Sequence, residues 1–149
     1  MALALMQNGI SVEDAVMVTA TNLMGMTEPA EKVEEQLRRG LPYRTLEKVM
    51  ENTGMTTNMV AQSLDIPMRT LMNHKKTGAL SSTESDKIYR LTRIFAMAIE
   101  MIGDKDEACE WMNELAPELG GVKPISLLDT DYGTERVVAL IENIMAGVP

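Results

Sequence analysis

The polar and basic side chains of residues 68–76 could do chemistry on a nucleic acid. If this segment is a helix, Leu71 and Met72 face inward. The outward side chains are then Arg69, Thr70, Asn73, Lys75 and Lys76. Arginine can donate two hydrogen bonds to guanine and asparagine can pair similarly with adenine, while threonine bonds a base edge or a phosphate and lysine neutralises phosphates. The residue types of this face therefore fit contact with DNA.

The preceding residues predict the element that would position this helix. Thr57 is expected to cap a short helix over residues 57–64, and Asp65-Ile66-Pro67 breaks the chain before the second helix. In a helix-turn-helix the second helix enters the major groove, which is about 12 Å wide, while the first crosses the backbone. Thr57 and His74 complete the candidate DNA contacts, and we interpret His74 as a phosphate-side or helix-end residue rather than a catalytic base. Spacing alone leaves open a helical hairpin that never touches DNA.

The charge distribution separates this region from the rest of the chain. The whole chain carries a net charge of −8, which should repel nucleic acid. Residues 66–93 contain six Lys or Arg and two acids, a local excess of four positive charges that leaves −12 on the remainder. This asymmetry favours one face that meets phosphate and others that meet a different partner. A solvated helix face is the alternative that charge by itself leaves open.

Several classes of protein are disfavoured by the composition. Cys109 is the sole cysteine and His74 the sole histidine, which argues against a disulfide within the chain and against a Cys/His zinc site. No apolar run approaches a membrane span, and no nucleophile motif or phosphate-binding glycine loop occurs, since Gly120-Gly121 fits a turn better. We therefore predict a cytoplasmic binding protein that is not an enzyme and has no metal, cofactor or membrane partner.

Capping residues and glycines divide the chain into helices, and no strand signal occurs, so the predicted fold is all-α. The best-specified helix begins at Ser81 or Ser82, where Ser81 and Glu84 form a capping box, and ends at Gly103. Its apolar positions recur at helical spacing, which makes it the expected central scaffold. The other expected helices are residues 11–25, 29–40, 42–54, one starting at residue 104, and 134–145.

The C-terminal part has a less regular pattern. The helix starting at Asp104 is expected to bury Ala108, Trp111, Met112 and Leu115 before Pro117 stops it. Residues 120–133 are typical of a loop with at most one helical turn. The final helix should be amphipathic.

The residues also resemble a known family. Residues 71–94, and above all Gly78-Ala79-Leu80-Ser81-Ser82-Thr83-Glu84-Ser85-Asp86-Lys87-Ile88, are similar to the Xre/MbcA/ParS antitoxins. The similarity continues through Ala108, Trp111, Leu119-Gly120-Gly121, Pro124, Leu127-Leu128-Asp129-Thr130 and Gly133, which resemble that family's C-terminal toxin-binding domain. Together the two stretches cover most of residues 41–149.

The resemblance implies a homodimeric antitoxin that represses its own operon through the helix-turn-helix and blocks a RES-domain toxin that consumes NAD. It divides the chain into an Xre-like helix-turn-helix at 41–80 and a helical toxin-binding domain at 81–149. It also places the C-terminal region beside the toxin's NAD-binding cleft, where it would occlude the active site. The candidate toxin-binding residues are Leu128, Asp129, Asp131, Tyr132, Gly133, Arg136, Val137, Ile141 and Ile144.

Residues 1–40 lie outside the resemblance. Their apolar face, which includes Val12, Val16 and Leu23, could serve a dimerisation arm, a lid on the core or additional scaffold. A rival function is a stand-alone helix-turn-helix repressor whose C-terminal half only dimerises or senses a small molecule. A neighbouring gene for a small RES-domain toxin would distinguish the antitoxin from this rival.

Overall fold

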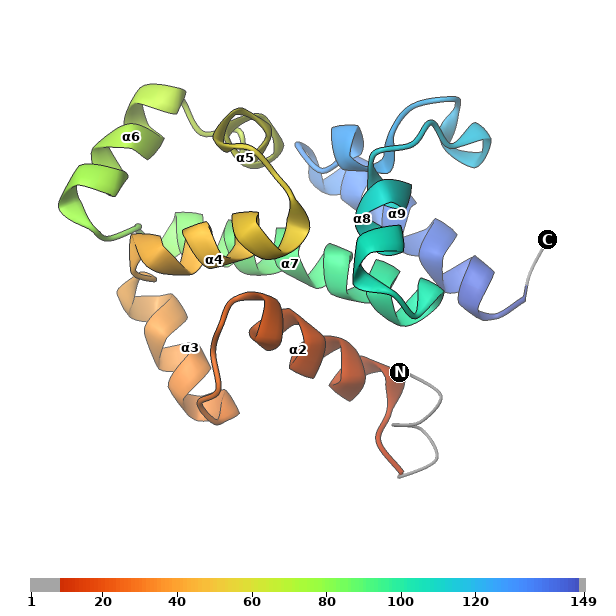
Figure 1. The fold of residues 1–149 in the computed structure, drawn as a ribbon, viewed down its shortest axis with the longest axis horizontal. Helices are drawn as coiled ribbons and strands as arrows, with labels where there is room; N and C mark the ends of the chain where they lie inside the picture. Colours follow the sequence, from red (N-terminus) through yellow and green to blue (C-terminus); the bar gives the residue numbers. More distant parts are fainter. Residues whose placement is uncertain (1–8, 148–149) are drawn as a thin grey trace.

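A computed structural model describes residues 9–147, and within that range every regular element is helical, as expected (Figure 1). The elements are α2 (Val12–Leu23), α3 (Ala30–Arg39), α4 (Tyr43–Thr53), α5 (Thr57–Leu64), α6 (Met68–Thr77), α7 (Ser82–Ile102), α8 (Lys105–Met112), the 3₁₀ turns η1 (Pro117–Leu119) and η2 (Pro124–Leu127), and α9 (Asp131–Met145).

Helix α7 is the central scaffold, as its sequence predicts. The Ser81 hydroxyl accepts the Glu84 N–H and the Glu84 carboxylate accepts the Ser81 N–H, so the predicted capping box forms. Gly103 ends the helix with a φ of 89°, in the left-handed region that glycine adopts without strain. Phe95 and Ile88 are fully buried, and α2, α3, α4, α5, α8 and α9 all contact this helix.

The N-terminal helix α2 is part of the scaffold. Its inner face, which includes Ala15, Val16 and Ala20, is buried, and α2 packs along α7 (Figure 1). The buried Thr19 hydroxyl donates a 2.6 Å hydrogen bond to Glu100 Oε1 in α7. Of the roles expected for residues 1–40, additional scaffold is therefore the one that the inner face of α2 has in this structure.

Two short extended segments join the start of α4 to the end of α6. The Leu80 N–H donates to the Leu41 carbonyl at 2.9 Å, and the Tyr43 N–H donates to the Gly78 carbonyl at 2.9 Å. The Leu41 N–H donates to the Ser85 hydroxyl of α7 at 2.7 Å. These bonds fix both ends of the α4–α6 unit against the central helix.

Three details of the sequence interpretation are wrong. Thr56, not Thr57, caps α5, because the Thr56 hydroxyl accepts the Met59 N–H at 3.2 Å. Helix α8 ends at Met112, and Leu115 is 68% exposed instead of buried. Helix α9 begins at Asp131, three residues before the expected start, since Thr130 caps it.

Candidate nucleic-acid interface and partner-binding half

Helices α5 and α6 form the predicted helix, tight turn, helix. Asp65 closes α5 in the left-handed region, with a φ of 52°, and Pro67 directly precedes α6. Aspartate adopts this conformation more readily than most residues do. Leu71 is fully buried and anchors α6 to the core. The turn thus places α6 at one end of the molecule (Figure 1).

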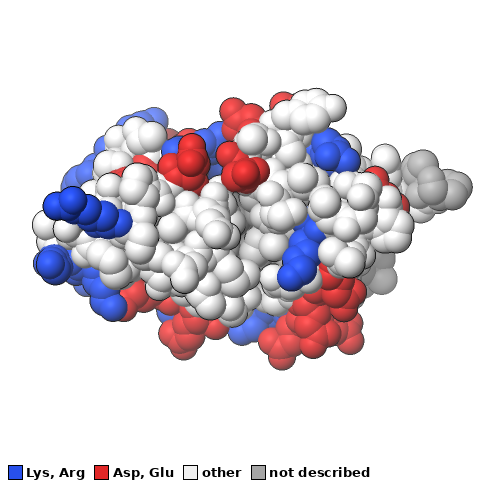
Figure 2. Space-filling view, turned by 90° about the horizontal axis from the view of Figure 1, so that it is seen from above, with Lys and Arg blue, Asp and Glu red and all other residues white. Residues whose placement is uncertain are grey.

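The outward face of α6 carries the predicted DNA contacts. Arg69, Asn73, Lys75 and Lys76 are exposed, and Thr70 is half-exposed. Within residues 9–147 neither Arg69, Lys75 nor Lys76 makes an ion pair. In Figure 2, Lys and Arg gather at the left end of the molecule, which contains α6, whereas acidic patches lie along the remainder. This end presents cations and hydrogen-bond donors free to meet phosphate and base edges.

His74 has an internal partner, which agrees with its interpretation as a helix-end residue, and its contact with phosphate stays a prediction. Its Nε2 lies 2.9 Å from a carboxylate oxygen of Glu84, and the two side chains are only 24% and 12% exposed. Burial acts to raise the pKa of Glu84, but hydrogen bonds from Ser81 and the proximity of His74 outweigh it and hold the pKa below its ordinary value. His74 therefore ties the end of α6 to the start of α7.

Thr57 lies within the first turn of α5 and is half-buried. Its hydroxyl is 4.0 Å from the Met50 sulfur, at the contact with α4. The role of Thr57 as a DNA contact stays a prediction.

The start of α9 is built around Thr130 and Gly133. The Thr130 hydroxyl accepts the Gly133 N–H at 2.9 Å. A Cβ on Gly133 would collide with the Leu127 carbonyl oxygen, so the close approach of η2 to α9 requires glycine here. Gly133 is buried and has a packing role in the single chain, while its contact with a toxin stays a prediction.

Val137 and Ile141 are covered by the chain's own core, and their contact with a toxin stays a prediction. Both are 0% exposed and belong to the chain's own core, which fixes α9 against α7. The hydrophobic period of α9 identified an apolar face but could not tell which of its members the core covers. Leu128 is half-buried, while Ile144 is 44% and Tyr132 is 75% exposed. Of the candidate set, these last two offer the most apolar surface to a partner.

Sequence reasoning missed two further exposed apolar side chains in this half, Leu115 and Val122. Leu115 directly precedes a short antiparallel contact between Ala116 and Val122, in which the Ala116 N–H donates to the Val122 carbonyl at 2.9 Å. Val122 is 37% exposed. Leu115 stands at helical spacing from Trp111 and Met112, so the local pattern carried no signal that the helix would end before it.

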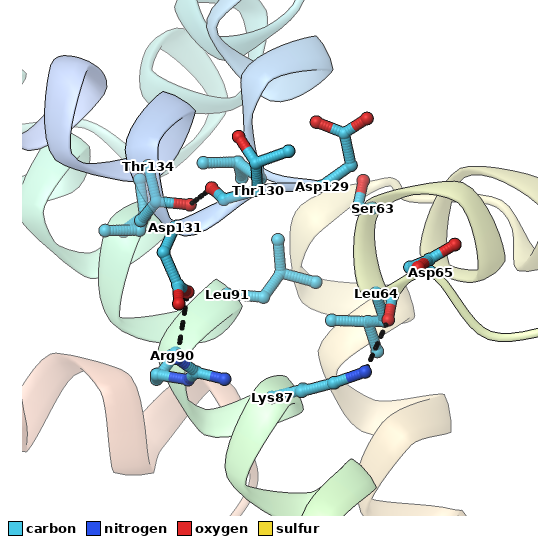
Figure 3. A pocket seen from close by; sticks show the side chains of 12 residues that line it. Ser63, Leu64, Asp65, Lys87, Arg90, Leu91, Asp129, Thr130, Asp131 and Thr134 are labelled. Atoms are coloured by element: carbon cyan, nitrogen blue, oxygen red, sulfur yellow. Dashed lines mark hydrogen bonds and ion pairs between the residues drawn. The ribbon is translucent and has the colours of Figure 1, made fainter.

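The acidic residues before and at the start of α9 face a cleft of about 140 Å³ between the two halves of the chain (Figure 3). Lys87 Nζ donates to the Leu64 carbonyl at 3.1 Å, which caps the end of α5, and Arg90 lies 3.3 Å from Asp131. Asp129 and Asp131 are exposed. Helix α7 thus connects the helix-turn-helix to the start of α9 through two basic side chains.

Arg136 is half-buried and donates to the Leu119 carbonyl at 3.2 Å. It lines a groove between η1 and α9 together with Leu119, Leu140 and Ile144. This bond holds the guanidinium group at the side of the groove.

The described part of the chain contains no group of three or more His, Cys, Asp or Glu side chains arranged to hold a metal ion. Across residues 9–147, no helix is long and apolar enough to cross a membrane.

The fold and the α6 face define a helix-turn-helix protein joined to a helical partner-binding half. A family model described as the antitoxin Xre-like helix-turn-helix domain matches residues 32–93, and one described as the antitoxin Xre/MbcA/ParS C-terminal toxin-binding domain matches residues 97–147. The gap between these matches falls inside α7, so this helix contributes to both halves.

Curated relatives agree with the family models. The chain is 31% identical to "Antitoxin Xre" of Photorhabdus laumondii over 75% of this chain and 77% of the relative. It is 27% identical to "Antitoxin Xre" of Pseudomonas putida over 78% of this chain and 72% of the relative, and 33% identical to that of Yersinia enterocolitica over 60% and 62%. The chain belongs to the Xre antitoxin family, and is accordingly a DNA-binding, toxin-neutralising antitoxin.

Proposed function

We propose that this chain neutralises a RES-domain toxin that degrades NAD, by occluding the toxin's active site, and that as a homodimer it represses its own operon in the cytoplasm. The observation that carries the proposal is the toxin-binding family match over residues 97–147, in a half of the chain with exposed apolar side chains on α9. This match favours the antitoxin over a stand-alone repressor.

Tyr132 and Ile144 are the anchors of the proposed toxin contact. Tyrosine is enriched among residues that dominate binding energy, and a 75% exposed ring at the start of α9 has a large area to bury. Ile144, near the other end of α9, borders the groove that Arg136 lines. Asp129 and Asp131 supply a polar rim beside Tyr132.

Arg69, Thr70, Asn73, Lys75 and Lys76 are the proposed operator contacts. Their exposure on one face of α6 supports this assignment. In a symmetric dimer the two copies of α6 would bind half-sites about 34 Å apart, or a multiple of this spacing.

Co-expression with a RES-domain protein encoded beside this gene tests the proposed function. The wild-type chain should hold cellular NAD at the level seen without the toxin. Tyr132→Ala and Ile144→Ala should each weaken toxin binding by about 30-fold, the effect of losing a strong anchor. Both side chains lie outside the core, so these variants should fold as the wild type does. Glu142→Ala, at an exposed position of the same helix, is the control and should neutralise normally.

Toxin binding and NAD hydrolysis measured on the same variants separate occlusion from inhibition at a distance. At concentrations that saturate the toxin, a bound variant with NAD hydrolysis restored supports occlusion, whereas undiminished inhibition by that variant contradicts it. If NAD falls despite an equimolar complex with the wild-type chain, the proposed neutralisation is refuted.

A further inference from the structure

The outer side of α2 and α3 carries an apolar groove that the functions above do not use. The groove has a volume of about 440 Å³ and is lined by Met17 and Val18 of α2, Val33 and Leu37 of α3, and Tyr89 of α7. Met17 is 46% and Val18 is 49% exposed. These adjacent side chains leave a continuous apolar surface open to water.

Helix α2 is apolar on two sides. Ala15, Val16 and Ala20 pack against α7, whereas Met17 and Val18 point away from that contact. A surface helix of a monomer normally turns polar residues outward. The second apolar side of α2 therefore indicates that a partner covers it.

The charges of α3 indicate what covers the groove. The acids Glu31, Glu34 and Glu35 precede the last two residues of the helix, Arg38 and Arg39, and Lys32 is the one basic residue among them. A helix that is acidic first and basic last is complementary in charge to a second copy of itself packed antiparallel. An isologous two-fold interface can bring the same helix of both subunits together in this way.

The ion pairs within α3 do not prevent two copies of this helix from packing antiparallel. Arg38 lies 3.6 Å from Glu34, with the two side chains 79% and 64% exposed, and Arg39 lies 2.8 Å from Glu35 with both more than half exposed. Ion pairs this exposed contribute little to stability. Glu34 also borders the groove, so it can turn to an arginine of a neighbouring copy at little cost.

The position of the groove leaves the other surfaces free. In Figure 1, α2 and α3 lie on one side of α4 and α7, while α5 and α6 lie on the opposite side. A partner on the groove would therefore leave the outward face of α6 open to DNA. Tyr132 and Ile144 of α9 do not line the groove either.

We propose that this groove is the homodimer interface of the antitoxin, with α3 of one copy packed antiparallel on α3 of the other and with Met17, Val18 and Leu37 at its centre. The inference rests on the homodimer of the proposed function and adds the surface through which it forms. A second copy supplies both the apolar side chains for the groove and the arginines for its acidic rim.

Light scattering on the full chain tests the apolar part of the interface. The wild type should be a dimer, and Met17→Asp and Val18→Asp should each raise the dimer dissociation constant by about 30-fold or more. Both positions are half-exposed in the single chain, so circular dichroism should show unchanged helix content. Glu13→Ala, exposed on the same helix, is the control and should stay dimeric.

Charge reversal tests the antiparallel arrangement. A variant with Glu31→Lys and Glu34→Lys keeps Glu35 as the one acid of α3, and a variant with Arg38→Glu and Arg39→Glu keeps Lys32 as its one base, so the first α3 is mostly basic and the second mostly acidic. Each should be monomeric alone, because like charges then face each other across the interface. Mixed together, the two variants should form a heterodimer, which differently tagged chains would reveal on co-purification.

The outcomes separate this proposal from the function on which it rests. A dimer unaffected by the groove variants overturns the interface, and so does a charge-reversed pair that fails to associate when mixed. A wild-type chain that stays monomeric, alone and on operator DNA, also overturns it and assigns the groove to another occupant. A monomeric groove variant that still binds the toxin while losing operator affinity supports both proposals, whereas a dimer that binds no toxin refutes the proposed function alone.

Discussion

Removing the Glu84 side chain should loosen both the start of α7 and the end of α6. The carboxylate accepts the Ser81 N–H at 2.9 Å and lies 2.9 Å from His74 Nε2. Glu84→Ala therefore removes two interactions, whereas His74→Ala removes only the second. Ser82→Ala, at an exposed position of the same turn, is a control that leaves both in place.

The size of the effect follows from the number of bonds and their burial. A helix-capping hydrogen bond contributes about 1 kcal/mol, and a hydrogen bond to a charged group contributes about 1.5 kcal/mol or more when it is well buried. Since these two side chains are partly exposed, we expect Glu84→Ala to lower the free energy of unfolding by about 2 kcal/mol and His74→Ala by about 1 kcal/mol. For a chain of this size, 1 kcal/mol corresponds to about 2–4 °C in Tm.

Urea unfolding monitored by circular dichroism measures this difference, and operator titration measures its effect on α6. Because the pKa of Glu84 is lowered in the folded chain, its contribution is fully present above the ordinary value of 4.5 and is lost as the pH falls through the lowered value. The gap between wild type and Glu84→Ala should therefore narrow in strong acid. Equal stability of Glu84→Ala and Ser82→Ala at neutral pH would refute the reasoning.

Three further results are expected. Arg69→Ala should weaken specific operator binding by about 1–3 kcal/mol. Lys75→Ala should mainly reduce the salt dependence of binding, by about one unit in the slope of the log binding constant against log salt concentration. If both variants bind the operator as the wild type does at matched salt, α6 is not the helix that contacts DNA. Thr19→Val should destabilise the chain by about 1–3 kcal/mol in urea unfolding, because the buried Glu100 then loses its hydrogen bond at Oε1 while Oε2 already lacks one. The double variant with Thr19→Val and Glu100→Met should recover most of this loss, because it leaves no buried carboxylate without a partner. Gly133→Ala should lower Tm by several degrees through the collision with the Leu127 carbonyl, and an unchanged Tm would show that η2 can move away from α9.

The exposed face of α6 could be predicted from local sequence because the signals that set it are local. Leu71 is buried and Arg69, Asn73, Lys75 and Lys76 are exposed, as the spacing of these residues indicated. Hydrogen bonds between side chains on different helices could not be predicted from local sequence. The link between His74 and Glu84 depends on how α6 packs against α7, and Thr19 and Glu100 are 81 residues apart.

In the partner-binding half, too, local sequence predicted one property of the side chains and tertiary packing decided another. Periodicity grouped Val137, Ile141 and Ile144 on one side of α9, but the structure buries the first two in the core and leaves the third 44% exposed. A hydrophobic period states which side chains share a face, not how much of that face another element covers.

The sequence by itself determined the helical class, the main caps, the helix-turn-helix and the family, because capping and periodicity act within a few residues and the family motifs are read directly. The tertiary structure decided which apolar side chains remain for a partner. Packing on α7 buries one side of α2 but leaves Met17 and Val18 open, and the end of α8 at Met112 leaves Leu115 in water. Exposure depends on every element that surrounds a residue, so it is fixed only when the helices come together.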